Sequence, residues 1–344
     1  MPHVSTLRNE LIFVEDARAS GVDPRDLQRA CRRGELVRVR RGVYIRTSTW
    51  SESGPRDRHL LSILAVVARC HPPYLVAGRS AGVLWGLPFA AEWPEDVVLL
   101  VPPVGGGSSE PGVRRTTVSA RAERGMLVDG IPATSLARTA LDMARAEDFA
   151  RAVAILDRAQ WRRDPHATTL EELCDVLAEA SFARRAAHLW RAVTFSTPLS
   201  DSPYESLARV AIHELGFEPP LLQVELRDAE GRIVPDFLWP GVAAAEFDGR
   251  VKYTRDEYTA GDPSRVVWAE KRREDRLRRM VPTVVRIVAD DLSDRRRLRA
   301  LLENAGIPRR ERTPFVATEP LPTGSVARER DQRPPEGSPG RLDG

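Results

Sequence analysis

A short run of charged residues inside two apolar segments constrains this chain more strongly than any other feature. Residues 234–239 (Val-Pro-Asp-Phe-Leu-Trp) and 243–248 (Ala-Ala-Ala-Glu-Phe-Asp) flank a Pro-Gly pair, which is typical of turns. We therefore expect a strand, a turn and a second strand, which bring Asp236 back to lie opposite Glu246. Because strand side chains alternate between faces, Glu246 and Asp248 share one face.

The carboxylates inside these apolar strands require an explanation for their burial, because charged groups are rarely buried unless they are paired or bind a metal. Hard divalent cations take oxygen ligands and keep positions open for water and phosphate. The pattern thus predicts that Asp236 and Glu246 hold Mg²⁺, with Mn²⁺ as a substitute. Asp248 precedes a glycine, so a turn aspartate is an alternative for that residue.

Residues 200–295 resemble the PD-(D/E)xK nuclease superfamily, in the branch of uncharacterised bacterial domains of unknown function related to very-short-patch-repair endonucleases. The resemblance rests on Ser-Pro-Tyr-Glu-Ser at 202–206, Pro-Asp at 235–236, Glu-Phe-Asp-Gly at 246–249, the charged helix at 270–277 and the apolar run at 283–287. It implies a restriction-endonuclease-like α/β domain and Mg²⁺-dependent hydrolysis of DNA phosphodiesters. The catalytic residues that it implies are Asp236, Glu246, Asp248, Lys252, Glu205 and Lys271.

Three of these residues have other readings. The family pattern puts lysine two positions after Glu246, but Asp248 stands there, and Lys252 reaches the site or pairs with Asp248. Glu205 either faces the site or is a first-turn glutamate favoured by the helix dipole. Lys271 points inward from a basic helix that either holds phosphate or is a salt-bridged, solvated helix.

The N-terminal segment has the outline of a winged helix-turn-helix. Apolar residues from Leu11 to Ala17 have helical spacing, and Asp23 with Pro24 predicts the start of a second helix that stops at Gly34. Residues 36–45 alternate apolar and basic side chains around an Arg-Gly turn, as a β-hairpin does. In this fold the second helix enters the DNA major groove and the hairpin is the wing.

Arginines cluster on both predicted elements, and they either contact DNA phosphates or form a solvated basic face. The candidate DNA-binding residues are Arg25, Arg29, Arg32, Arg33, Arg38, Arg40 and Arg41. Residues 34–44, 77–81 and 131–134 resemble AbiEi-family antitoxins of type IV toxin–antitoxin systems. That resemblance implies a transcriptional regulator of its own promoter, with DNA and a cognate toxin as partners.

The middle region, residues 57–195, alternates helical and strand patterns, so we expect an α/β body. A helix over residues 59–68 ends before a His-Pro-Pro break, residues 97–101 form a buried strand, and Thr134 or Ser135 caps a later helix. Ser80 is expected to be a helix cap, because the sequence offers it no His or Asp partner for nucleophilic catalysis.

The chain thus divides into a winged helix-turn-helix (1–50), a middle region (57–195), a nuclease-like domain (196–308) and a disordered tail (309–344), in the mixed α/β class. Three scattered cysteines and the lack of a membrane-length apolar run favour a cytoplasmic protein with no membrane partner. Two functions compete. One is a DNA-binding regulator whose nuclease-like domain cleaves DNA, and the other is a non-catalytic repressor or antitoxin whose nuclease-like domain binds only nucleic acid or protein.

Overall fold

The structure is a computed structural model of the chain. It describes residues 2–88, 93–102, 110–117, 125–178, 186–248 and 263–310, with the side chains of residues 2–3 and 263–270 left out. Lys252 and the predicted tail from residue 311 onward lie outside the described residues.

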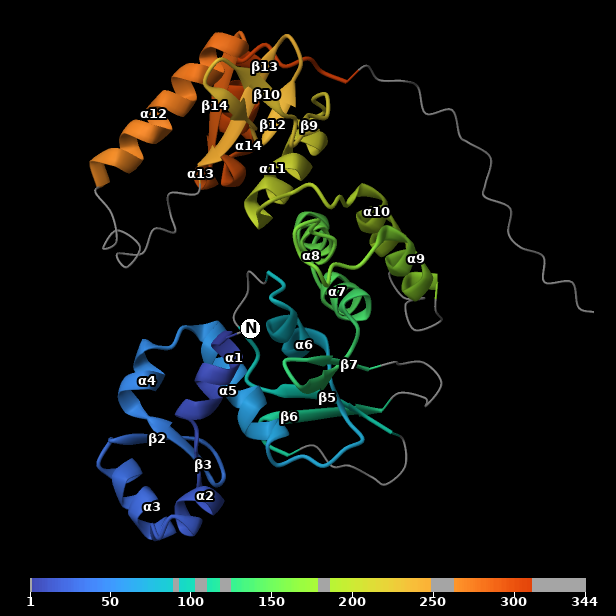
Figure 1. Cartoon of the computed structure of the whole chain (residues 1–344). Helices are drawn as coiled ribbons and strands as arrows, with labels where there is room; N and C mark the ends of the chain where they lie inside the picture. Colours follow the sequence, from blue (N-terminus) through green and yellow to red (C-terminus); the bar gives the residue numbers. More distant parts are fainter. Residues whose placement is uncertain are drawn as a thin grey trace, which may run out of the picture. The chain divides into compact units, whose positions relative to one another are not determined.

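The N-terminal segment folds in the order expected for a winged helix-turn-helix. Its elements are α1 (Pro2–Glu10), β1 (Ile12–Phe13), α2 (Val14–Ala19), α3 (Pro24–Arg32), β2 (Leu36–Arg40) and β3 (Val43–Arg46) (Figure 1). The three strands form an antiparallel sheet in the order β1-β3-β2. The predicted hairpin and the Asp23 cap of α3 are confirmed, since the Asp23 carboxylate accepts the Arg25 N–H at 2.8 Å.

The single helix expected from Leu11 to Ala17 is wrong. Residues 12–13 are extended and pair with Tyr44 and Val43 of the hairpin, and α2 begins only at Val14. The apolar residues therefore serve a strand and a helix in succession, and helical spacing alone did not reveal the change.

The middle region is built on a five-stranded mixed sheet in the order β6-β5-β4-β8-β7. Its strands are β4 (Leu75–Val76), β5 (Val97–Val101), β6 (Val113–Thr117), β7 (Met126–Val128) and β8 (Ile131–Ala133). Its helices are α4 (Thr47–Glu52), α5 (Pro55–Val67), α6 (Gly78–Trp85), α7 (Leu136–Ala144), α8 (Phe149–Ala159), α9 (Leu170–Ala178) and α10 (Ala186–Phe195). The expected cap of α7 is confirmed at Ser135, whose side chain accepts the Arg138 N–H.

The N-terminal hairpin and the middle region share one apolar core. Val43 and Ile45 of β3 are fully buried in the same cluster as Leu60 and Leu61 of α5. Burying such aliphatic side chains contributes about 2 kcal/mol each. The hairpin is thus fixed on α5 by packing.

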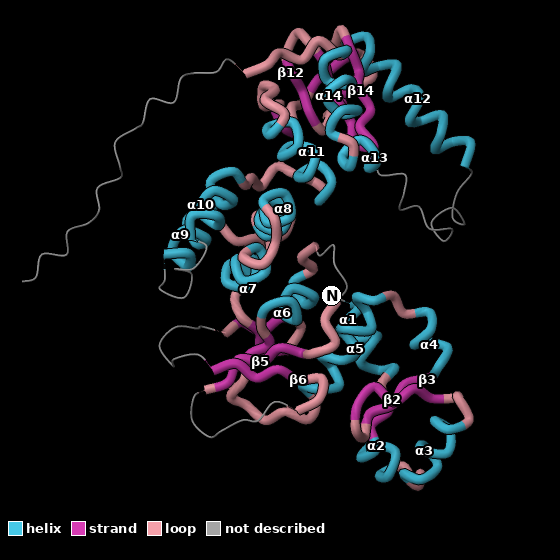
Figure 2. The backbone as a smooth tube through the Cα atoms, turned by 180° about the vertical axis from the view of Figure 1, so that it is seen from behind, coloured by secondary structure: helices cyan, strands magenta, loops and turns pink. Residues whose placement is uncertain are grey.

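The C-terminal region has a four-stranded sheet in the order β14-β13-β12-β9, in which β13 is antiparallel to β12 and parallel to β14. Its elements are α11 (Pro203–Glu214), β9 (Leu221–Leu222), β10 (Leu226–Asp228), β11 (Gly231–Ile233), β12 (Phe237–Trp239), β13 (Ala243–Asp248), α12 (Pro263–Met280), β14 (Thr283–Val288), α13 (Ala289–Ser293) and α14 (Arg295–Asn304). One face of the sheet packs on α11 and α14, and the opposite face packs on α12 (Figures 1 and 2).

Helix α11 packs on both sides. Ala208 and Ile212 are buried against the C-terminal sheet, whereas Val210 is buried in the core of the middle region, where α11 lies on α8. Between these faces, Arg209 of α11 forms a buried ion pair with Asp157 of α8, at 2.9 Å. The described helices include none that is long and apolar enough to cross a membrane.

Candidate functional site

The strand–turn–strand prediction is confirmed and places the two main carboxylates together. Phe237 of β12 pairs with Ala245 of β13, so Asp236 and Glu246, one residue beyond that pair, are neighbours. The Asp236 Oδ2 accepts the backbone N–H of Phe247 at 2.7 Å. This bond ties the start of β12 to the strand that carries Glu246.

Glu205 joins this pair from the first turn of α11. Ser202 caps the helix by accepting the Glu205 N–H, and the Glu205 Oε2 accepts the backbone N–H of Asp201 at 2.9 Å. Burial, reinforced by the nearby charge of Asp236, raises the pKa of Glu205 to about 7. Glu205 therefore supports the helix start and lies within electrostatic range of Asp236, and its catalytic role stays a prediction.

Burial also raises the pKa of Asp236 and of Glu246 above their ordinary values, since a carboxylate loses hydration energy inside the protein. Arg273 opposes this shift at both residues. The carboxyl groups of Glu205, Asp236 and Glu246 are thus all partly shielded from water, and Arg273 compensates only part of their negative charge.

Arg273 is a cation that enters this site, and none of the expectations from the sequence named it. Its guanidinium donates to the Val234 carbonyl at 2.6 Å, and its Nη2 lies 2.8 Å from the Glu246 Oε1. The signal was helical spacing, because Arg273 precedes the fully buried Leu277 by four residues and so shares its face. Lys271, which was expected to point inward, is exposed.

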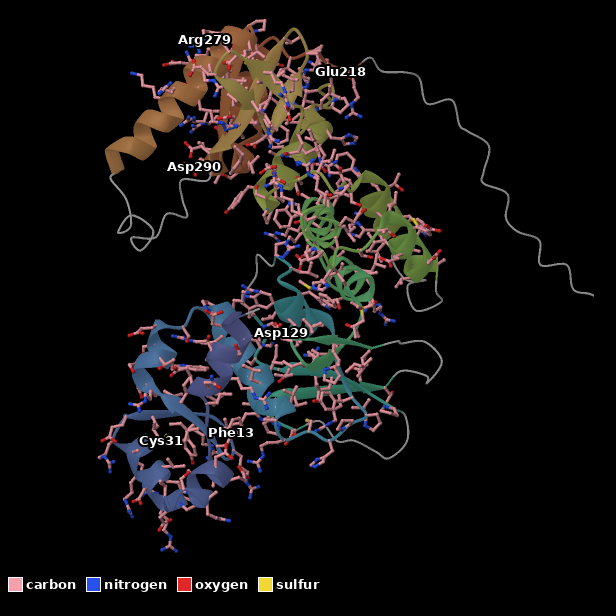
Figure 3. All side chains as sticks on the ribbon, viewed as in Figure 1. Phe13, Cys31, Asp129, Glu218, Arg279 and Asp290 are labelled. Atoms are coloured by element: carbon pink, nitrogen blue, oxygen red, sulfur yellow. The ribbon has the colours of Figure 1, made fainter. Side chains whose placement is uncertain are left out.

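Four further arginines of α12 are paired with acidic residues, as the salt-bridged alternative predicts. The pairs are Arg272–Glu230, Arg276–Asp228, Arg278–Glu274 and Arg279–Glu230, and Arg279 is labelled on α12 in Figure 3. Asp248 is likewise paired, at 3.1 Å, with Arg286 of β14. These groups are therefore engaged within the domain.

Asp236 and Glu246 are the two side chains of this site that could hold a hard cation. The Glu246 Oε1 is buried and, despite the nearby arginine, accepts no aligned hydrogen bond from the described residues. Among the described side chains, no three His, Cys, Asp or Glu residues converge as a metal-binding group. A cation held by Asp236 and Glu246 would take its other ligands from water or substrate, as Mg²⁺ does.

The second candidate site is the arginine-rich surface of α3 and the hairpin. Six of the seven predicted arginines are exposed, and Arg40 is the exception. Arg29 is paired with Asp26, and Arg33 with Glu35. The other four exposed arginines form no ion pair with any described residue, and they are Arg25, Arg32, Arg38 and Arg41.

Arg40 faces the middle region instead of solvent. Only 17% of its side chain is exposed, its Nη1 donates to the Gly112 carbonyl at 3.3 Å, and its Nη2 lies 3.4 Å from Glu110. It differs from its neighbours because it joins the hairpin to the loop before β6. The sequence, in which it is one arginine of a run, carries no signal of this difference.

The expected role of Ser80 as a helix cap is wrong. The N-cap of α6 is Ala77, and the buried Ser80 hydroxyl instead accepts the Val98 N–H at 3.0 Å and lies 3.0 Å from the His59 Nε2. Burial lowers the pKa of His59 to about 4, so the ring is neutral. With 0% and 4% of their surfaces exposed, Ser80 and His59 are out of reach of a substrate and form a core pair.

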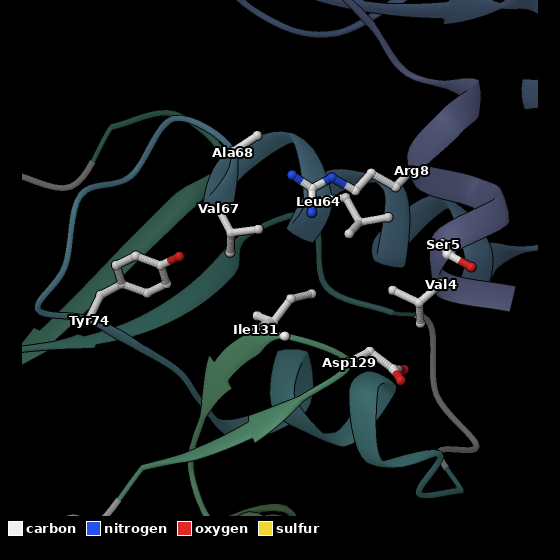
Figure 4. A pocket seen from close by; sticks show the side chains of 10 residues that line it. Val4, Ser5, Arg8, Leu64, Val67, Ala68, Tyr74, Asp129 and Ile131 are labelled. Atoms are coloured by element: carbon white, nitrogen blue, oxygen red, sulfur yellow. The ribbon is translucent and has the colours of Figure 1, made fainter. Parts of the chain in front are cut away.

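A cavity of about 450 Å³ lies between α1, α5 and the turn from β7 to β8 (Figure 4). Arg8 and Asp129 contribute charges to its wall, and Tyr74 contributes an aromatic ring. None of the residues predicted for catalysis or DNA contact lines it.

Comparison with protein families finds a match in the N-terminal segment. Residues 9–47 match the family described as "Transcriptional regulator, AbiEi antitoxin". These residues include β1, α2, α3 and the hairpin, so the match falls on the arginine-rich surface and supports a DNA-binding antitoxin or transcriptional regulator.

No curated protein matches the chain. Among solved structures, the crystal structure of the RV2827C protein from Mycobacterium tuberculosis is 17% identical, with a TM-score of 0.35, over 66% of this chain and 87% of that chain.

Proposed function

We propose that this protein is a transcriptional regulator of the AbiEi antitoxin type that binds duplex DNA through α3 and the β2–β3 hairpin. The observation that carries the proposal is the coincidence of three features on one segment. Residues 9–47 match that family, their elements follow the winged-helix order, and they expose four arginines that no described acidic residue neutralises.

The two elements divide the work of recognition. Arg25 and Arg32 lie on α3, which has an Asp23 N-cap and a proline at its first position. A helix with such a stable start is suited to insertion into the major groove. Arg38 and Arg41 lie on the hairpin, where long guanidinium side chains reach backbone phosphates. Contacts of this kind give affinity and register, and base edges give sequence preference.

Binding of the full chain to a labelled promoter fragment, measured by fluorescence anisotropy, tests this proposal. Replacing Arg25 and Arg32 with Gln should weaken binding by at least tenfold, because two phosphate or base contacts at about 1 kcal/mol or more each are lost. The matched control is Arg296→Gln plus Arg299→Gln, which removes the same two charges from exposed positions on α14. Equal affinity for the double variant and the control would refute the proposal.

An antitoxin also has a protein partner, and we propose a cognate toxin encoded beside this chain. The test is growth of cells that express the neighbouring gene, with and without this full-length protein. Growth arrest relieved by the wild-type chain supports the pairing, and arrest that the chain does not relieve counts against it.

A second candidate function, metal-dependent hydrolysis of DNA phosphodiesters, is favoured by the carboxylate site. The C-terminal order of helix, three antiparallel strands, helix and parallel strand agrees with a restriction-endonuclease-like domain, and Asp236 and Glu246 meet at its central strands. The Glu246 Oε1 is buried and accepts no aligned hydrogen bond from the described residues, so it would bind a cation if the Arg273 guanidinium, 2.8 Å away, moved aside. Mg²⁺ bound there would supply a bound water of lowered pKa and polarise a phosphate.

The protein's own groups have definite parts in this scheme. Asp236 and Glu246 would hold the cation, and Glu205 would accept or hold a proton near neutral pH because its pKa is about 7. Arg273 would neutralise charge at Glu246 until a cation takes its place, and its guanidinium would then pair with a phosphate. Lys252 and Lys271 stay candidates from the family pattern, with Asp248 engaged by Arg286.

Calorimetry with MgCl₂ or MnCl₂ and plasmid nicking, both on the full chain, test this second function. Metal binding and nicking that vanish in Asp236→Asn plus Glu246→Gln, but persist in the surface control Asp175→Asn, would support it. A wild-type chain that neither binds metal nor nicks DNA would leave the non-catalytic regulator.

A further inference from the structure

The turn of the hairpin is fastened to the middle region. Arg69, just past the end of α5, donates from Nη1 to the Arg41 carbonyl at 3.1 Å, and Arg40 donates to the Gly112 carbonyl from the other side. Gly42 has a φ of 78°, and a Cβ at this position would collide with the Arg69 guanidinium. The wing is therefore part of a continuous surface with the end of α5 and with β6.

A polar pocket of about 490 Å³ opens where these elements meet. Its basic wall comes from the hairpin, the end of α5, the following loop and β6, and consists of Arg40, Arg41, Arg69, His71 and Arg115. Glu110 is its acidic residue, and Tyr74 adds an aromatic side chain. Arg40 is bonded to Gly112 and Glu110, so the donor set that this concave surface offers to phosphate oxygens consists of the guanidinium groups of Arg41, Arg69 and Arg115.

The local acids do not balance this positive charge. Glu110 is shared by Arg40 at 3.4 Å and Arg115 at 3.2 Å, and Glu15 lies 3.3 Å from Arg69. Among the described residues, two glutamates thus lie against four arginines, and Arg41 forms no ion pair with any of them. Because like charges repel, this arrangement favours an anionic ligand that supplies the missing negative charge.

We propose that this pocket binds phosphates of the DNA backbone that flank the duplex held by α3 and the hairpin, an inference that rests on the proposed DNA binding. Arg41 connects the two surfaces, because it lies in the turn of the wing and also lines the pocket. A strand that follows the wing therefore reaches Arg69 and Arg115, which lie outside residues 9–47. The DNA footprint extends from the winged helix onto the middle region.

The salt dependence of DNA binding measures this contact directly. Affinity of the full chain for a labelled mixed-sequence duplex of about 30 base pairs is measured across a salt series, since each phosphate contact contributes about 0.9 to the log–log slope. Replacing Arg69 and Arg115 with Gln should lower the slope by about 2, and replacing both with Lys should preserve it.

The neighbouring Arg114 provides the matched control. It lies on the same strand as Arg115, 65% of its side chain is exposed, and it does not line the pocket. Arg114→Gln should therefore leave the slope close to that of the wild type. Because Arg69 also holds the hairpin turn, Arg115→Gln alone is measured as well, with an expected slope change of about 1.

The outcomes separate the two proposals. If the wild-type chain does not bind the duplex, the proposed DNA binding fails and this inference falls with it. If the wild type binds and Arg25→Gln plus Arg32→Gln weakens binding, but the pocket variants keep the slope of Arg114→Gln, DNA binding stands and the pocket contact is overturned. Slopes reduced only in the pocket and α3 variants support both.

Discussion

The buried His59 should make the stability of this protein depend on pH in a way that one substitution removes. His59 is 4% exposed, its Nε2 lies 3.0 Å from the Ser80 hydroxyl, and its ring stacks on Trp93 at 5.9 Å. Burial lowers its pKa from 6.5 to about 4, because the imidazolium ion would lose its hydration there. The folded state therefore binds this proton less readily than the unfolded state does.

The sign and size follow from linkage. Since the unfolded chain takes up the proton first as pH falls below about 6.5, the free energy of unfolding decreases from that pH down to the folded pKa of about 4. Between about pH 7 and about pH 5, this one group should cost about 2 kcal/mol of stability. His59→Gln, which keeps a polar group and cannot titrate, should lack that part of the loss.

Urea unfolding of the full chain, followed by tryptophan fluorescence, provides the assay. The wild type and His59→Gln are compared at about pH 7 and about pH 5, so that other titrating groups cancel in the difference. Trp93, one of the seven tryptophans that contribute to this signal, stacks on the His59 ring. Parallel loss of stability in the two proteins over this range would refute the assignment of His59 as a neutral, buried base.

Three further outcomes follow from other buried contacts. Asp157→Asn should destabilise the chain by about 3 kcal/mol, because it leaves Arg209 buried without its counter-charge, and urea unfolding measures the loss. The buried Glu205 has a pKa of about 7, so the wild type should lose stability as pH rises from about 5 to about 8 and the acid ionises. Glu205→Gln cannot ionise, so its free energy of unfolding, measured in the presence of a chelator, should rise relative to that of the wild type by about 2 kcal/mol over this range. Arg40→Gln should lower the melting temperature but leave the salt slope of DNA binding unchanged, because Arg40 bonds to Gly112 and not to solvent.

Each of these has an outcome that contradicts it. An unchanged unfolding midpoint for the aspartate variant would mean that the pair between α8 and α11 is not formed. A pH-independent difference for the glutamate variant would mean that the carboxyl group is hydrated. A reduced salt slope for the arginine variant would mean that Arg40 contacts phosphate.

Local chemistry made much of the architecture predictable. Asp23 followed by proline marks the start of α3, and the apolar segments around the Pro-Gly pair specify β12 and β13 with Asp236 beside Glu246. In these cases the residues that set the structure are close in sequence. The division into regions and the nuclease-like assignment of the last one stay predictions.

Long-range partners were out of reach of the sequence. His59 and Ser80 come from different helices, Arg40 bonds to a carbonyl 72 positions away, and β1 forms only because a later hairpin pairs with it. Arg273 was within reach, because its spacing from the buried Leu277 places it on the inner face of α12.

The double packing of α11 limits how this protein can be divided or exchanged. A helix with apolar residues on two faces, one for each neighbouring core, cannot be cut away with either neighbour without exposing the other set to water. The carboxyl-terminal sheet is thus not an interchangeable cassette, since any replacement would have to reproduce a surface that fits α8 as well as its own strands. Insertions are better tolerated in surface loops than at the chain segment that leads into this helix.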